Sequence, residues 1–139
     1  MTPPFRILEH TADVGFEAFG STRKEVFENA ARAMLHLIVD PGCVEPSETV
    51  LIEVTGSDPL NLLVNWLSEI LYLHDAEHWL FRDFELTSLD DHVASGRAWG
   101  EQFNRARHQT NLQIKAVTYH QLSLEECEGG WRAQVYVDI

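Results

Sequence analysis

Two aspartates stand at the ends of apolar, strand-like runs, one near each end of the chain. Asp13 lies in residues 10–15 (HTADVG), and Asp138 precedes Ile139, whose α-carboxylate is a further acidic group. If the two runs form neighbouring strands, the three groups converge, and carboxylates at close range repel one another. Either protonation of one group or a bound hard cation such as Ca²⁺, Mg²⁺ or Mn²⁺ relieves this repulsion. We therefore predict a divalent-metal site formed by Asp13, Asp138 and Ile139.

Each aspartate also has an ordinary structural explanation. Asp13 could form an Asx-type turn leading into Gly15, and Asp138 could be a solvated residue at the end of a strand. His10 and His120 are candidate neighbours, as ligands or as residues that orient the ligands, although a structural imidazole is the commoner role of a histidine. The metal hypothesis depends on Asp13 and Asp138 meeting.

A second candidate is the pair His74 and His78, which have the i, i+4 separation of zinc-binding helices. The sequence between them does not match H-E-x-x-H, because the glutamate lies beside the second histidine. We therefore favour a structural role at a helix end over a zinc site.

Basic residues gather in one short stretch, at Arg97, Arg105, Arg107, His108 and Lys115. They could meet a phosphate, a carboxylate of a partner, or only the acidic residues around them. We single out Lys115 because it heads a predicted strand, where its charge must emerge at an edge or rim.

Apolar periodicity predicts the elements that position these residues. Alternating patterns predict strands over residues 5–10, 14–19, 49–55, 79–89, 93–99, 114–124 and 131–139. Thr22 and Glu25 form a capping box at the start of one helix, and Asp58 followed by Pro59 begins a second. This order predicts one α+β domain over residues 1–139, with a largely antiparallel sheet covered by two helices.

The charge balance restricts the partners that the protein can bind. The chain has 22 acidic and 10 basic residues, for a net charge of −12, so direct nucleic-acid binding is disfavoured and docking on a basic protein is favoured. Acidity that serves only solubility is the alternative. No apolar run is long enough to span a membrane, and the first residues do not resemble a signal peptide, so we expect a cytoplasmic protein. Cys43 and Cys127 are then expected to be reduced thiols.

Common catalytic motifs are absent from the sequence. It contains no P-loop, no G-x-S-x-G, no G-x-G-x-x-G and no C-x-x-C, and no nucleophile is paired with an evident base. We expect a protein that is not an enzyme.

The chain resembles the archease family over nearly its whole length. The residues that carry the resemblance are HTADVG at 10–15, Thr22, Glu25, Phe27, Ala30 and Ala31, IKAVTYH at 114–120, and the final Val137, Asp138 and Ile139. The resemblance implies a strand-helix-strand-strand module with an inserted helical unit. It also implies a protein cofactor of the RtcB-type RNA ligase, which joins RNA ends in tRNA splicing and RNA repair.

The resemblance assigns roles to particular residues as well. The family's metal-site positions match Asp13, Asp138 and Ile139, with Ca²⁺ the favoured ion and Mg²⁺ or Mn²⁺ as alternatives, and its functional lysine matches Lys115. Archease-like proteins promote guanylylation of the ligase, which itself holds GTP and the catalytic Mn²⁺. A protein of this kind either delivers metal or supports the geometry of guanylylation. We favour support, because a protonated lysine cannot act as a metal ligand.

Other functions remain as alternatives. The family has also been linked to tRNA methyltransferases, as a chaperone that limits aggregation and sharpens specificity. A metal-dependent hydrolase using Asp13 and Asp138 is a further alternative, as is an interaction module without metal.

Overall fold

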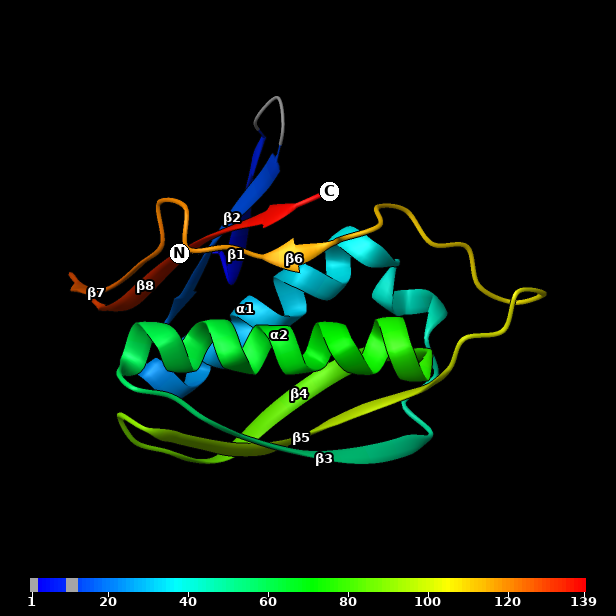
Figure 1. Cartoon of the computed structure of the whole chain (residues 1–139), viewed down its shortest axis with the longest axis horizontal. Helices are drawn as coiled ribbons and strands as arrows, with labels where there is room; N and C mark the ends of the chain where they lie inside the picture. Colours follow the sequence, from blue (N-terminus) through cyan, green and yellow to red (C-terminus); the bar gives the residue numbers. More distant parts are fainter. Residues whose placement is uncertain (1–2, 10–12) are drawn as a thin grey trace.

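Two antiparallel sheets enclose two helices in this fold (Figure 1). The computed structural model describes residues 3–9 and 13–139. The elements, in chain order, are β1 (Phe5–Glu9), β2 (Asp13–Gly20), α1 (Arg23–Ile38), a 3₁₀ turn η1 (Pro41–Cys43), β3 (Glu48–Thr55), α2 (Pro59–Glu77), β4 (Trp79–Leu89), β5 (Val93–Gln102), β6 (Ala116–Val117), β7 (Ser123–Cys127) and β8 (Gly130–Asp138). The order of helices and antiparallel strands confirms the predicted α+β class.

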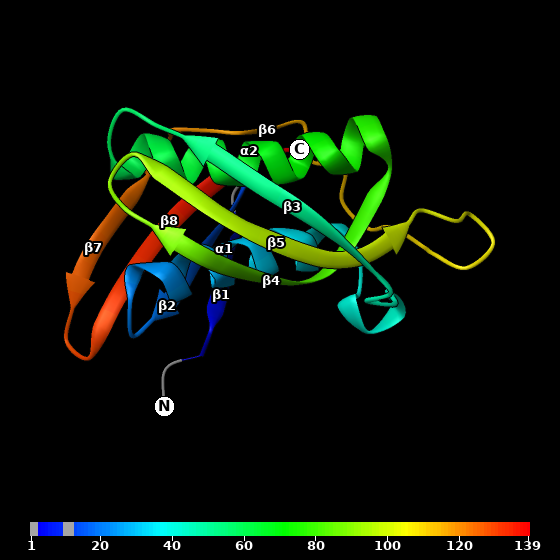
Figure 2. The same ribbon diagram turned by 90° about the horizontal axis from the view of Figure 1, so that it is seen from below.

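The strands divide into a five-stranded and a three-stranded sheet. The larger sheet has the order β1-β2-β8-β6, with β7 also paired to β8, and the smaller has the order β3-β5-β4. Seen from below, β3, β5 and β4 lie on the near side of the helices, and β2 and β8 lie beyond them (Figure 2). The helices form a middle layer, with α1 packed on β2 and β4 and α2 packed on β3.

Both helices begin at the predicted caps. The Thr22 hydroxyl accepts the N–H of Glu25 at 3.1 Å, and the Asp58 carboxylate accepts the N–H of Asn61 at 2.8 Å. These bonds satisfy donors that the first helical turn leaves without intrahelical partners. The two predicted helix starts are therefore confirmed.

Apolar side chains of both sheets meet on the two helices. Phe16 of β2, Trp66 of α2 and Phe84 of β4 are each at most 1% exposed. The Trp66 indole N–H donates to the carbonyl of Phe27 at 3.0 Å, which joins α2 to α1 and satisfies the one polar atom of this large side chain.

The turn between β4 and β5 falls in the gap between the strands predicted over residues 79–89 and 93–99. The Asp90 carboxylate accepts the N–H groups of His92 and Val93, at 2.8 and 2.7 Å. These bonds lower the pKa of Asp90, because they stabilise its ionised form.

The strand predicted over residues 114–124 is wrong, because the chain leaves the sheet within it. Within this stretch, only β6 and the start of β7 pair with β8, and a turn at residues 120–121 separates these two strands. The Tyr119 hydroxyl accepts a hydrogen bond from Asn61 at the start of α2, and Gln121 has a left-handed φ of 50°. These contacts replace ladder bonds that a continuous strand would make.

None of the helices in the part of the chain that the structure describes has the length and apolar character needed to span a membrane.

Candidate metal centre

The structure brings together the two aspartates from opposite ends of the chain. Asp13 at the start of β2 and Asp138 at the end of β8 are direct partners in the antiparallel register. Side chains of directly opposite residues lie on the same face of a sheet, with Cβ atoms about 4.5–5.5 Å apart. In Figure 1, the end of β8 accordingly lies against β2.

The alternation of side chains decides which face carries the aspartates. Phe16 and Ala18 of β2, and Val135 and Val137 of β8, are fully buried against the helices. Residues at the other parity, including Asp13 and Asp138, must therefore point to the opposite face. Burying the apolar set in this register places the carboxylates together outside the core.

Lys115 lies directly beside this pair through its main chain. Its N–H donates to the carbonyl of Asp138 at 2.8 Å, and the next residue, Ala116, is the register partner of Asp138. The Lys115 side chain is exposed, and it forms no ion pair within residues 3–9 and 13–139. The main chain of an exposed lysine therefore adjoins the strand end that carries Asp138.

His120 contacts the aromatic ring of Tyr136, which lies two residues before Asp138 on the same strand. Tyr136 is the register partner of Gly15, and a Cβ atom on Gly15 would lie only 2.7 Å from its ring, so glycine is required for this close approach. The His120 ring packs against Tyr136, with centroids 5.5 Å apart and planes at 67°. The sequence did not predict this contact between Gly15 and Tyr136, because the contact depends on the register of two distant strands.

The predicted neighbour His10 lies outside the described residues. Its role beside Asp13 stays a prediction, and so does the role of His120.

The end of the larger sheet that carries Asp13 and Asp138, here called the corner, has donor groups that fit a hard cation. Asp13 and Asp138 supply carboxylate oxygens, the Oδ1 atom of Asp13 is buried, and the carboxylate of Ile139 follows Asp138 directly. Such oxygens suit Ca²⁺, Mg²⁺ or Mn²⁺. Among the residues that the structure describes, no group of three or more His, Cys, Asp or Glu side chains is arranged around a metal position. A complete site would therefore need a donor of another kind, and the predicted role of the Ile139 carboxylate as that donor stays a prediction.

The structure explains His74 and His78 without zinc. The Nδ1 atom of His74 lies 2.9 Å from the carbonyl oxygen of Trp79, and His78 ends α2 in a left-handed conformation with φ of 64°. Both residues thus shape the end of the helix.

Most of the basic stretch is neutralised by neighbouring acids. The Arg97 guanidinium donates to Glu85, and Arg107 and His108 both bond Glu101. Of the three roles considered for these residues, pairing with their own acids is the one that the structure supports.

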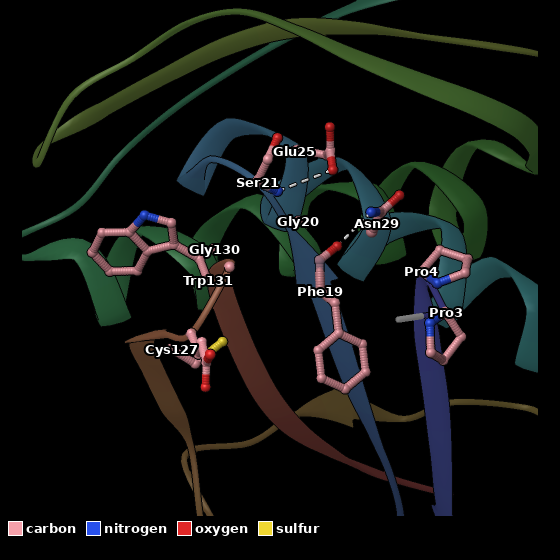
Figure 3. Close-up of a pocket in the computed structure, with 12 residues that line it drawn as sticks. Pro3, Pro4, Phe19, Gly20, Ser21, Glu25, Asn29, Cys127, Gly130 and Trp131 are labelled. Atoms are coloured by element: carbon pink, nitrogen blue, oxygen red, sulfur yellow. Dashed lines mark hydrogen bonds between the residues drawn. The ribbon is translucent and has the colours of Figure 1, made fainter. Parts of the chain in front are cut away.

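A separate pocket of about 280 Å³ lies at the other end of β2 and β8, between the end of β2 and the turn before β8 (Figure 3). Two of its polar side chains bond main-chain groups of the lining, because Glu25 accepts the N–H of Ser21 and Asn29 donates to the carbonyl of Phe19. It is thus distinct from the corner that carries Asp13 and Asp138.

Comparison with known proteins shows the same similarity over the whole chain. The model of the Archease protein family matches residues 5–139. A protein archease of Methanosarcina acetivorans is 45% identical, covering 97% of this chain and 95% of its own, and one of Methanopyrus kandleri is 39% identical, covering 98% and 99%.

Two solved structures share the fold. The solution structure of protein 1598 of Methanobacterium thermoautotrophicum superimposes with a TM-score of 0.82 at 34% identity, covering 98% of this chain and 99% of that one. The crystal structure of a Thermotoga maritima archease, described as a possible chaperone, gives 0.65 at 18% identity, covering 100% and 98%. At that lower identity the likeness concerns the fold alone.

Proposed function

Because the chain belongs to the archease family, we propose that it is an accessory protein that activates an RtcB-type RNA ligase in tRNA splicing and RNA repair. It promotes guanylylation of the ligase and its repeated turnover, and it catalyses no reaction itself. The net charge of −12 supports docking on a basic protein surface over direct binding of RNA.

The observation that carries this proposal is the register pairing of Asp13 with Asp138, beside the main-chain bond from Lys115 to Asp138. This arrangement brings two carboxylates together at one corner of the larger sheet, next to the main chain of an exposed lysine. It supports a divalent-cation site formed by Asp13, Asp138 and Ile139.

Each residue of the corner has a definite task in this proposal. The aspartates and the Ile139 carboxylate hold the cation, which supplies positive charge near the phosphates of the bound nucleotide when it is present. The Lys115 ammonium group is a second positive charge and neutralises a phosphate at the mouth of the ligase active site. We favour this support of guanylylation geometry over delivery of metal, because Lys115 cannot bind a cation while protonated.

A guanylylation assay of the ligase tests the proposal. Asp13→Ala, Asp138→Ala and Lys115→Ala should each abolish the stimulation that the wild-type protein gives, because each removes one charge from the corner. Glu126→Ala is the matched control, since this carboxylate is exposed on β7 of the same sheet, and it should stimulate normally. Full stimulation by the Asp138 variant would refute the proposal.

Metal binding has its own readout in thermal or urea unfolding. Ca²⁺ at about 100 times its dissociation constant should raise the free energy of unfolding by about 2.7 kcal/mol, because only the folded state binds it. The Asp138→Ala variant should lose this gain, whereas Glu126→Ala should keep it. A wild-type protein indifferent to Ca²⁺, Mg²⁺, Mn²⁺ and EDTA would exclude the cation site.

A second candidate is a chaperone and specificity factor for a tRNA methyltransferase. It is favoured by the description of the Thermotoga maritima archease as a possible chaperone. Affinity capture separates the two, since recovery of a methyltransferase without the ligase, together with reduced methyltransferase aggregation, would favour the chaperone.

A further inference from the structure

The smaller sheet has two edges, and the structure protects only one of them. The edge at β4 is covered by side chains of α1, because Glu28 accepts the N–H of Leu86 at 2.8 Å and Arg32 donates to the carbonyl of Phe84 at 2.9 Å. Register shifts in β4 further interrupt its ladder. Bulges and covering side chains are common means by which proteins prevent another strand from pairing with an edge.

The edge at β3 has neither kind of protection. Its eight residues pair with β5 in unbroken register, and they include no proline or lysine. Just beyond the strand, the N–H of Gly56 donates to the carbonyl of His92. By the antiparallel alternation, Thr49, Leu51 and Glu53 therefore direct their N–H and C=O groups away from β5.

These outward groups are available for pairing. Within the residues that the structure describes, the main-chain groups of Thr49, Leu51 and Glu53 take part in no hydrogen bond, and only the carbonyl of Thr55 is covered, by the Asn65 amide. Leu51 is 81% exposed at the centre of the strand. An apolar residue so placed on a regular open edge is typical of strands that accept a further strand.

The inner face of β3 also lacks cover at its edge. Val50 and Val54 point towards the helices but are only half-buried, whereas Ile52 between them is 3% exposed. Both views show α2 beside β3 (Figures 1 and 2). A strand added to β3 would lie along this flank of α2, and its inward apolar side chains would complete the burial of both valines.

The charges around this edge select the partner. Neither β3 nor α2 contains a lysine or arginine, and their acidic residues are Glu48, Glu53, Glu69, Asp75 and Glu77. Arg97, opposite Leu51 on β5, is paired with Glu85. A second copy of this chain, with its own charge of −12, would meet like charge.

We propose that β3 is a docking edge for an extended, lysine- or arginine-rich segment of a protein partner, which adds to the smaller sheet as a fourth strand. Main-chain hydrogen bonds to Leu51 and Glu53 fix its register. Apolar side chains at alternate positions cover Val50 and Val54, and basic side chains on the opposite face of the added strand lie beside Glu53. This edge belongs to the smaller sheet, whereas Asp13 and Asp138 belong to the larger, so the inference stands independently of the ligase role.

Amide hydrogen exchange with a probe peptide tests the inference. The probe is a blocked peptide as long as β3, with lysine and valine at alternate positions. It should slow exchange at the Leu51 and Glu53 amides at least about tenfold while leaving Ile52, already bonded to β5, unchanged. A peptide with glutamate in place of lysine should have no effect.

Two variants separate main-chain pairing from charge. Leu51→Pro removes an outward N–H at an edge position where proline is tolerated, so it should abolish binding and leave the melting temperature unchanged. Leu51→Thr is the matched control, because it keeps the N–H and should bind. If proline disturbs the fold, Glu53→Lys tests the charge requirement instead, since this reversal on the lysine-facing side should weaken binding of the lysine probe at least about tenfold.

Several outcomes would overturn the inference. These are unchanged exchange at Leu51 and Glu53 with the lysine probe, equal protection by the glutamate peptide, or self-association of the wild-type chain through β3.

Discussion

At the scale of single residues, Glu101 joins three segments through one carboxylate. It accepts hydrogen bonds from the N–H of Glu45, from Arg107 at 2.6 Å and from His108 at 2.9 Å. The Arg107 bond is the main cause that lowers the pKa of Glu101 to about 2, and the Glu45 and His108 bonds add to it against the opposing effect of burial. The network holds the residues after β5 against the sheet.

This shift makes stability depend on pH in a defined direction. The pKa of Glu101 falls from 4.5 to about 2 on folding. Its contribution to the free energy of unfolding is therefore fully present above about pH 4.5 and is lost as the pH falls towards 2. Glu101→Gln should therefore lower the free energy of unfolding by about 1–3 kcal/mol at pH 7, and the difference from wild type should shrink on acidification. Urea unfolding across this pH range measures both.

The matched control for this prediction is Glu85→Gln. Its ion pair with Arg97 joins two side chains that are 51% and 43% exposed, so the loss should stay below about 1 kcal/mol. Equal effects of the two substitutions, or a Glu101 effect independent of pH, would contradict the role assigned to this network.

Sequence patterns identified the basic residues between Arg97 and Lys115 but not the acidic residues that bond them. The stretch from Arg97 to Lys115 was recognised as basic, and pairing with nearby acids was one of three explanations. Glu101, however, is one charged residue among many in the sequence, and only the fold shows that it is 8% exposed and bonded to both Arg107 and His108. Burial of a charged side chain depends on tertiary contacts, which single-sequence patterns do not contain.

At the scale of elements, the cap of α1 is the clearest local determinant of structure. Thr22→Ala removes the acceptor for the Glu25 N–H and should cost about 1 kcal/mol of stability, as is usual for N-cap threonines. Thermal or urea unfolding measures the change.

Ser21→Ala provides the control for this cap, because in the structure it is the main-chain N–H of Ser21, not its hydroxyl, that bonds Glu25. This variant should unfold like wild type. A larger loss from Ser21 than from Thr22 would show that the cap is assigned to the wrong residue.

Elements with strong local signals were predicted well. The caps at Thr22 and Asp58 and the turn at Asp90 depend on side chains that bond nearby main chain, so short stretches of sequence contain the information. The strand predicted over 114–124 failed because Tyr119 bonds Asn61, a residue far away in the sequence. A left-handed Gln121 also has no local signal, since glycine is the usual residue there.

At the scale of the whole molecule, the candidate corner lies beside the last strand residues and away from the start of β1. β1 begins opposite Ala18, at the end of β2 remote from Asp13, whereas β8 ends at Asp138 beside it. A short glycine-serine tail after Ile139 displaces the terminal carboxylate and should reduce the Ca²⁺-dependent rise in melting temperature. The same tail placed before Met1 should leave that rise intact, and equal effects of the two tails would exclude Ile139 as a ligand.

The meeting of Asp13 and Asp138 was a conditional prediction, because a sequence does not state which strands are neighbours. The alternation of apolar residues in both runs did predict their faces, and once β2 and β8 pair, that alternation sets the register. The division of the strands into two sheets had no comparable signal. It depends on how α1 and α2 pack between them.

The place of β8 in the chain has a consequence for synthesis. β8 pairs with β2, β6 and β7, so during translation β2 keeps an open side until the last strand has emerged from the ribosome. Pairing between such distant segments forms slowly, and an unfinished sheet is prone to aggregation in the meantime. Any activity that needs both aspartates is consequently restricted to chains whose final strand is in place, and nascent or truncated chains lack it.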